Sequence, residues 1–293
     1  MNDFDKLPRM VAIHDISGLG KCSLTVALPI VSASGVECCC IPTALLSTHT
    51  GCFTDWTFRD LSDDILPIAE HWSKLDDIKF DAIYSGYLAS EKQGELLEKC
   101  IDYLKGEDTL VIVDPAMADN GKYYANFDNK MAACFRRLIA KADIITPNIT
   151  EACFITETEY VPAPHSDEFV YGLIEKLSAL GPKTVAITGV CPDNEHVGIV
   201  AKDNQAGKTA RFMNVSREGT FHGSGDVFAS SFAALLVRGA DMEIALSLAE
   251  AFVSDCVERT EKRNIPRHYG LDFESALPQY IKNIEKTFGQ KTV

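Results

Sequence analysis

The sequence predicts an α/β fold in which helices cover both faces of a mostly parallel central sheet. Short apolar runs of strand type alternate with segments of helical period from residue 10 to about residue 260. No linker interrupts this alternation, so a single domain over residues 1–293 is expected, with residues 1–9 as a loose polar extension. Later in the chain, the polar turn at 203–207 joins two strand-like runs and predicts a few antiparallel strands.

Each element follows from its local pattern. Apolar runs that end at turn-forming residues predict strands at 10–14, 36–42, 81–84, 109–113, 143–146, 183–188, 196–202 and 208–214. Apolar residues spaced three and four apart predict helices at 24–34, 91–104, 129–141, 168–180, 224–237, 242–258 and 272–288. Ser23 has the residue type of a helix N-cap, whereas the glycine-rich segment 15–20 predicts a loop. Ligands of open α/β sheets bind beyond the carboxyl ends of the strands, so the loops at that edge are expected to form the site.

The composition argues against several functional classes. The net charge of −14 repels nucleic acid and anionic lipid, and no run of Lys or Arg offsets it. No apolar run reaches the roughly 18 residues of a membrane span. The segment 15–23 lacks glycines that a dinucleotide fingerprint and a phosphate-binding P-loop require. Ten cysteines without CxxC spacing indicate reduced thiols, so we expect a cytoplasmic protein with no nucleic-acid or membrane partner.

The sharpest local signal is the segment from Gly219 to Asp226, which runs directly into an apolar helix. Gly223 and Gly225 allow the backbone to turn tightly and to approach a ligand closely. The start of the helix leaves backbone N–H groups unpaired, and together these features predict an anion-binding site. Asp226 would repel an anion unless its carboxylate takes part in chemistry beside it. In the alternative interpretation, the segment is a plain helix start and Asp226 satisfies helix N–H groups.

Two other strand ends carry carboxylates. Asp114 and Asp119 follow the strand at 109–113, and they either help to hold Mg²⁺ or form an ordinary turn. Asn148 and Glu151 follow the strand at 143–146 and are three residues apart. Glu151 can reach a metal-bound water, or the pair can simply cap a helix start. Each of these segments, taken alone, leaves both interpretations open.

In their order and spacing, these segments resemble the ribokinase-like superfamily and, within it, the pyridoxal kinases. The matching segments are Ser47-Thr48-His49-Thr50-Gly51, Ser85-Gly86-Tyr87-Leu88, Asp114-Pro115, Thr146-Pro147-Asn148 with Glu151, and Gly223-Ser224-Gly225-Asp226. The resemblance covers residues 10–260 and implies a three-layer α/β/α ribokinase-like fold. It also implies ATP-dependent phosphorylation of the 5′-hydroxymethyl group of pyridoxal, pyridoxine or pyridoxamine, which gives the 5′-phosphate and ADP.

The resemblance implies a role for each residue of the site. Asp226 would be the catalytic base, and the anion hole around the transferred phosphoryl group would be formed by Gly223, Ser224 and Gly225. The residues that bind substrate would be Asp15, Thr50, Tyr87 and Asp226. The residues that bind nucleotide would be Asp119, Thr146, Asn148, Thr188, Phe221, His222, Gly223 and Gly225. Asp114 and Glu151 would hold Mg²⁺, and a flap that starts at Asp119 and runs through Gly121, Tyr123 and Tyr124 would close over the site.

The sequence departs from the pyridoxal kinases at Asp15, where that family commonly has a serine. Here the chain is similar to the hydroxymethylpyrimidine kinases. The Asp15 carboxylate can accept hydrogen bonds from an amine or a ring N–H, which would favour pyridoxamine over pyridoxal. A hydroxymethylpyrimidine kinase, or a non-catalytic binder of nucleotide or pyridoxal phosphate, is therefore the alternative function. ATP and Mg²⁺ are the implied cofactors, a monovalent cation is left open, and a homodimer is expected by analogy.

Overall fold

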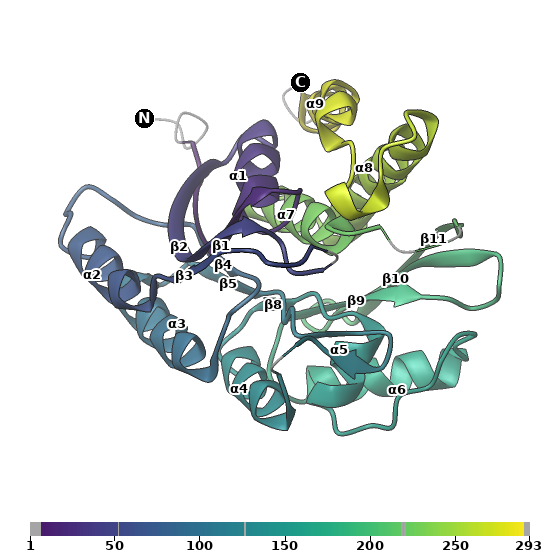
Figure 1. Cartoon of the computed structure of the whole chain (residues 1–293), viewed down its shortest axis with the longest axis horizontal. Helices are drawn as coiled ribbons and strands as arrows, with labels where there is room; N and C mark the ends of the chain where they lie inside the picture. Colours follow the sequence, from purple (N-terminus) through teal and green to yellow (C-terminus); the bar gives the residue numbers. More distant parts are fainter. Residues whose placement is uncertain (1–6, 52, 126, 218, 220, 290–293) are drawn as a thin grey trace.

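The computed structural model describes residues 7–51, 53–125, 127–217, 219 and 221–289. Its main strands are Arg9–Leu19 (β1), Glu37–Thr48 (β2), Phe58–Asp60 (β3), Ala82–Ser85 (β4), Leu110–Val113 (β5), Ile144–Ile145 (β8), Thr184–Val190 (β9), His196–Asp203 (β10) and Lys208–Val215 (β11). They form one sheet in the spatial order β11-β10-β9-β8-β5-β4-β1-β2-β3 (Figure 1). The strands from β9 to β2 run parallel, whereas β3, β10 and β11 pair antiparallel. The predicted sheet is therefore confirmed.

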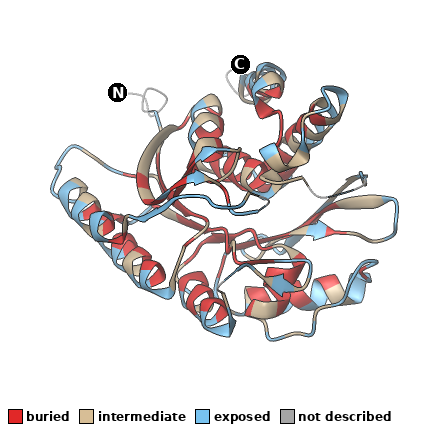
Figure 2. Ribbon diagram, viewed as in Figure 1, coloured by how far each residue is buried: buried red, intermediate tan, exposed pale blue. Residues whose placement is uncertain are grey.

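Helices cover both faces of this sheet (Figure 1). One face carries Leu24–Ala33 (α1), Ser224–Val237 (α7), Met242–Lys262 (α8) and Phe273–Gly289 (α9). The other carries Ser62–Trp72 (α2), Glu91–Leu104 (α3), Asn129–Ile139 (α4), Ile149–Ile155 (α5) and Asp167–Ser178 (α6). The central strands are buried on both sides, as Figure 2 shows. In β5, Val111 and Val113 face one core and Ile112 the other, which explains why this strand is apolar throughout.

The first two strands are longer than predicted. The sequence predicts a loop at 15–20, but β1 continues to Leu19 and β2 continues to Thr48. Ser17 pairs with Leu46 and Leu19 with Thr48, after a register shift between His14 and Ile16. The strand β3, which was not predicted, pairs with the far end of β2. Glycine and polar residues favour a loop locally, but a partner from a distant segment makes a strand favourable here.

A small hairpin lies next to the carboxyl edge of the sheet. It consists of Ala118–Asp119 (β6) and Lys122–Tyr123 (β7), and it corresponds to the predicted flap. Its turn contains Asn120 and Gly121, both with positive φ. At the N-terminus, Arg9 already belongs to β1, so the predicted loose extension is shorter than residues 1–9, and residues 1–6 lie outside the described part.

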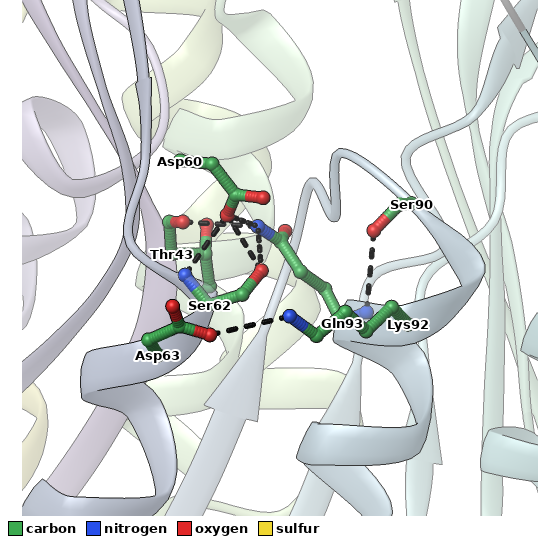
Figure 3. A network of polar contacts seen from close by, with 7 residues as sticks. All are labelled: Thr43, Asp60, Ser62, Asp63, Ser90, Lys92 and Gln93. Carbon is green, nitrogen blue, oxygen red and sulfur yellow. Dashed lines mark hydrogen bonds and ion pairs between the residues drawn. The ribbon is translucent and has the colours of Figure 1, made fainter.

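A buried polar network joins the helices beside β2 (Figure 3). The Gln93 side chain is 1% exposed, and its amide donates to the carbonyl of Thr43 at 2.9 Å and to Asp60 at 3.1 Å. Asp60 also accepts hydrogen bonds from the backbone and the hydroxyl of Ser62. One glutamine therefore fixes β2, the start of α2 and the start of α3 relative to one another.

The described part of the chain also shows the character of its helices and the state of its cysteines. None of the described helices combines the length and the hydropathy that a membrane span requires. The nine cysteines in the described ranges are free thiols, and Cys52 lies outside those ranges. Five of the nine are only partly buried, among them Cys38, Cys39 and Cys40 on β2.

Candidate active site

The first turn of α7 lies at the carboxyl edge of the sheet. Gly223 is the N-cap and has a φ of 77°, and no side chain caps the helix at this residue. A Cβ on Gly223 would lie 2.2 Å from the carbonyl oxygen of Lys21, so only glycine fits there. A Cβ on Gly225 would meet nothing within 4 Å. The backbone of this turn is thus close to the loop before α1 on one side and open on the other, as an anion site requires.

Asp226 lies in this turn and lines a cavity with part of its surface. Its carboxylate accepts a hydrogen bond from the backbone N–H of Ser23, in the loop before α1. Burial raises the pKa of Asp226 to about 7, this N–H group opposes the rise, and the negative charge of Asp15 adds to it. The carboxyl therefore faces the cavity and the Ser23 loop, which disfavours the interpretation that it only caps α7.

The cavity has a volume of about 170 Å³ and brings together residues from distant parts of the chain. Asp15, Thr50, Tyr87 and Asp226, the four predicted substrate-binding residues, all line it. The other lining residues are Ser17, Cys22, Ser23, Leu46, His49, Gly51, Ala116, Tyr124, His222 and Gly223. Carboxyl groups therefore lie at two points of this small pocket, one at Asp15 and one at Asp226.

Asp114 directly follows β5 and is buried, with 8% of its surface exposed. Its backbone N–H donates to the carbonyl of Ser85 at the end of β4, at 2.9 Å. Burial raises the pKa of Asp114 to about 8, the charge of Asp226 adds to the rise, and the hydroxyl of Thr146 opposes it. Asp114 and Asp226 thus lie close enough to repel each other when both are ionised.

Glu151 is the second buried carboxyl beside this edge, with 3% of its surface exposed. It accepts hydrogen bonds from the N–H groups of Met117 at 3.0 Å and Asn148 at 2.9 Å. Burial and the charge of Asp114 still raise the pKa of Glu151 well above its usual range. Asn148 and Glu151 also form the capping box of α5, so the structural interpretation of this motif is confirmed.

The predicted nucleotide-side residues occupy neighbouring strand ends. Thr146 follows β8, and Asn148 forms a parallel bridge with Thr188 of β9. The Asn148 side chain also donates to the carbonyl of Ala118 at 2.8 Å, and the N–H of Gly121 donates to the hydroxyl of Thr150 at 3.0 Å. The same helix start therefore positions Glu151 and anchors the flap.

Two other predicted nucleotide-side residues, Phe221 and His222, precede the α7 turn. The ring of Phe221 lies under the guanidinium of Arg267, 4.6 Å away. His222 lines the same cavity as Asp226, and its ring is 5.3 Å from that of His49. Asp119, on the exposed flap, is near enough to His222 that each charge affects the pKa of the other group. His222 is thus also a neighbour of the substrate-side residues.

Comparison with known proteins places the chain in a family. A family model described as phosphomethylpyrimidine kinase matches residues 28–270. The chain belongs to this family. A structure from Bacteroides thetaiotaomicron VPI-5482, provisionally assigned to the same family and solved with pyridoxal, is 34% identical, with a TM-score of 0.87 over 94% of this chain and 96% of that one.

Relatives of this chain are named for different activities. The pyridoxal kinase PdxY of Leifsonia xyli subsp. xyli is 26% identical over 86% of this chain and 89% of its own. The chloroplastic thiamine biosynthetic bifunctional enzyme TH1 of Arabidopsis thaliana is also 26% identical, but the match spans only 47% of that protein. The pyridoxal kinase of Leishmania donovani, solved with ADP and pyridoxamine, shares the fold at 21% identity over 93% of this chain and 95% of that one (TM-score 0.80).

Sequence reasoning missed the part that Ser23 plays. It was predicted to cap α1, but its φ is 53° and its side chain makes no capping hydrogen bond. The side chain instead hydrogen-bonds to Asp15, while its N–H bonds to Asp226. His49 also lines the cavity and is a hydrogen-bonded loop histidine: its Nδ1 accepts from the Gly51 N–H at 3.1 Å, and its Nε2 lies 2.6 Å from the carbonyl oxygen of His268. The family's histidine in the segment 47–51 was the available signal for it.

Proposed function

We propose that this protein transfers a phosphoryl group from ATP to the 5′-hydroxymethyl group of a B6 vitamer and releases the 5′-phosphate and ADP. One observation carries the proposal. The carboxyl of Asp226 lies in a small pocket lined by Tyr87 and Thr50 and at the open N-terminus of α7. An acceptor alcohol and a phosphoryl group can therefore meet at one carboxylate. The pyridoxal kinases among the relatives support this choice of acceptor.

In this mechanism, Asp226 accepts the proton of the hydroxymethyl group. A carboxylate with a pKa near 7 is a stronger base than an ordinary aspartate at neutral pH. The backbone N–H groups at Gly223, Ser224 and Gly225 hold the transferred phosphoryl group. These groups are fixed by the helix before the substrate arrives, so little reorganisation is needed in the transition state.

The buried carboxyls of Asp114 and Glu151 fit a divalent cation. The charge of Asp114 raises the pKa of Glu151, so a positive charge beside them would relieve their repulsion. No group of three or more His, Cys, Asp or Glu in the described part of the chain is arranged to hold a metal by itself. Mg²⁺ suits such a site, because it is usually held by one or two carboxylates, water and substrate phosphates. When bound, Mg·ATP supplies the phosphoryl group and neutralises charge that develops on it.

The flap excludes water from the reaction. Tyr124, directly after β7, lines the cavity, and its N–H donates to the carbonyl of Met117 at 2.9 Å. Asn148 and Thr150, at the start of α5, hold the hairpin through hydrogen bonds to its backbone. Closure over the bound acceptor would leave the hydroxymethyl group as the only nucleophile near the phosphoryl group.

Hydroxymethylpyrimidine is the second candidate acceptor. The family model is named for phosphomethylpyrimidine kinase, and Asp15 stands where pyridoxal kinases commonly have a serine. Both candidates are small aromatic rings that carry a hydroxymethyl group. The fold, the base and the anion site would therefore serve either one without change.

ADP release with Mg·ATP and each acceptor tests the proposal. We expect turnover with at least one B6 vitamer, and a loss of about 10²- to 10⁴-fold in kcat for Asp226→Asn, since general-base catalysis contributes this much. Asp76→Asn, an exposed aspartate in the loop after α2, is the matched control and should behave as wild type. Turnover only with hydroxymethylpyrimidine would identify that compound, and not a B6 vitamer, as the substrate. If Asp226→Asn is active, or if no acceptor gives turnover, the mechanism is refuted. Either result favours a non-catalytic binder of nucleotide or pyridoxal phosphate.

We also propose that residues 1–293 form a single domain, that the protein is cytoplasmic and that it forms a homodimer. The dimer rests on the family resemblance alone. Light scattering of the purified protein tests it, with about twice the chain mass of 32.2 kDa expected.

A further inference from the structure

The cavity contains a second carboxylate that the proposed reaction does not use. Asp15 lies on β1, is 4% exposed and forms one wall of the cavity. It follows directly on His14, where the pairing of β1 with β2 changes register. Irregular pairing of this kind re-aims side chains and is common beside active sites.

The groups around Asp15 are mostly neutral donors, and His49 is the charged neighbour that favours its ionised form. The hydroxyl of Ser17 donates to it at 3.2 Å, and the Ser23 side chain also hydrogen-bonds to it. The titratable groups that line the cavity with it are Cys22, His49, Tyr87, Tyr124, His222 and Asp226. Neither Lys nor Arg is among the described residues lining the cavity. Burial raises the pKa of Asp15, whereas the hydrogen bonds from Ser23 and Ser17 and the charge of His49 oppose the rise.

One residue contacts both carboxylates of the cavity. Ser23 bonds to Asp15 through its side chain and to Asp226 through its backbone N–H. Because both carboxyls line one small cavity, a ring with its hydroxymethyl group at Asp226 can place a neighbouring substituent at Asp15. That substituent must carry an N–H or O–H donor if Asp15 is to regain the hydrogen bonds it loses to burial.

We propose that Asp15 selects substrates with an amine on the ring position next to the hydroxymethyl-bearing carbon, and that it makes pyridoxamine the preferred B6 vitamer. This inference rests on the proposed function. The aminomethyl group of pyridoxamine is cationic at neutral pH and would pair with the Asp15 carboxylate. Pyridoxine offers a neutral hydroxyl there. The aldehyde oxygen of pyridoxal can only accept hydrogen bonds, so it would face the carboxylate unfavourably.

Hydroxymethylpyrimidine presents the same chemistry, because its ring amine also lies beside its hydroxymethyl group. The two amine-bearing rings are distinguished by measuring both. Hydrogen bonds that involve a charged group are about twice as strong as neutral ones, so the cationic amine of pyridoxamine is expected to gain more from Asp15 than the neutral ring amine does.

Calorimetric titration of each acceptor without nucleotide tests the inference, with kcat/KM measured alongside. In wild type, pyridoxamine should bind at least about tenfold more tightly than pyridoxal, which is the scale of one charged hydrogen bond. In Asp15→Asn that ratio should fall to within about threefold. Asp15→Ser, which restores the common serine of the pyridoxal kinases, should show the same loss, and Asp76→Asn is the control for removing one negative charge.

Equal affinities for pyridoxamine and pyridoxal in wild type would overturn the inference. So would an equal loss for all three vitamers in Asp15→Asn, because that pattern places the carboxylate against the ring nitrogen that they share. Binding does not require turnover, so the two proposals fail separately. Selective binding of pyridoxamine without ADP release refutes only the kinase reaction, whereas unselective turnover refutes only the role of Asp15.

Discussion

At the scale of single residues, the candidate site brings several carboxyl groups close to one another. Asp114, Glu151 and Asp226 are each buried or partly buried, and each has a raised pKa because burial and a neighbouring carboxyl act in the same direction. Buried carboxyls of this kind lower the stability of the folded protein, so selection for stability alone would remove them. A catalytic centre that binds a cation and removes a proton needs this charge, so the folded protein carries the cost.

Replacing Asp226 by Asn should therefore stabilise the protein at high pH. The pKa of Asp226 is about 7 in the folded protein and about 4 in the unfolded chain, so wild type loses stability as the pH rises from 4 to 7. Asp226→Asn has no such loss. Urea unfolding should show a gain of about 2–4 kcal/mol at pH 8 and almost none at pH 4.5. A variant that is less stable than wild type at pH 8 would contradict this account of the charge.

At the scale of elements, the flap depends on one glycine. Gly121 has a φ of 73°, and a Cβ there would lie 2.7 Å from the Tyr160 ring. Gly121→Ala should displace the turn and lower kcat/KM for the vitamer about tenfold, with more ATP hydrolysis when no acceptor is present. Gly172→Ala, in α6 with nothing within 4 Å of its Cβ, is the control. Unchanged coupling of ADP release to product in Gly121→Ala would show that the flap does not exclude water.

The network around Gln93 makes a separate prediction about stability. Gln93→Ala would leave the Ala89 N–H without its present partner, whereas the Thr43 carbonyl would keep its hydrogen bond from the Leu61 N–H. An unpaired group of this kind costs about 1–3 kcal/mol, so we expect a loss of about 1–3 kcal/mol in the free energy of unfolding. Gln279→Ala, in the exposed surface of α9, should change it by less than about 0.5 kcal/mol. Similar effects of the two substitutions would rule out the structural role given to Gln93.

Prediction from sequence succeeded where an element is determined locally. The helices at 91–104 and 224–237 have the predicted bounds, because their apolar spacing and flanking residues suffice to define them. It failed at β3 and at the far ends of β1 and β2, which become strands only by pairing with each other. It failed at Ser23 for the same reason, since its partners, Asp15 and Asp226, lie in segments that only the fold brings together.

At the scale of the whole molecule, the strand order explains how the site forms. The residues of the cavity and its neighbourhood come from the ends of β1, β4, β5 and β8 and from the start of α7, which are far apart in sequence. Parallel strands place all these ends at one edge of the sheet, as Figure 1 shows. The position of the site was therefore predictable from topology, whereas the register shift beside Asp15 was not.

The net charge of the chain predicts how kcat/KM for ATP depends on salt. The chain carries a charge of −14, and the candidate site itself contains carboxylates, so an anionic nucleotide approaches against a repulsive field. Salt screens this field, because the Debye length falls from roughly 20 Å at 20 mM to about 7 Å at 200 mM. At constant free Mg²⁺, kcat/KM for ATP should therefore rise about two- to fivefold over this range. Under saturating ATP, kcat/KM for pyridoxine, which is uncharged at its substituents, should change by much less. A fall in kcat/KM for ATP would show that local cations outweigh the overall charge at the entrance to the site.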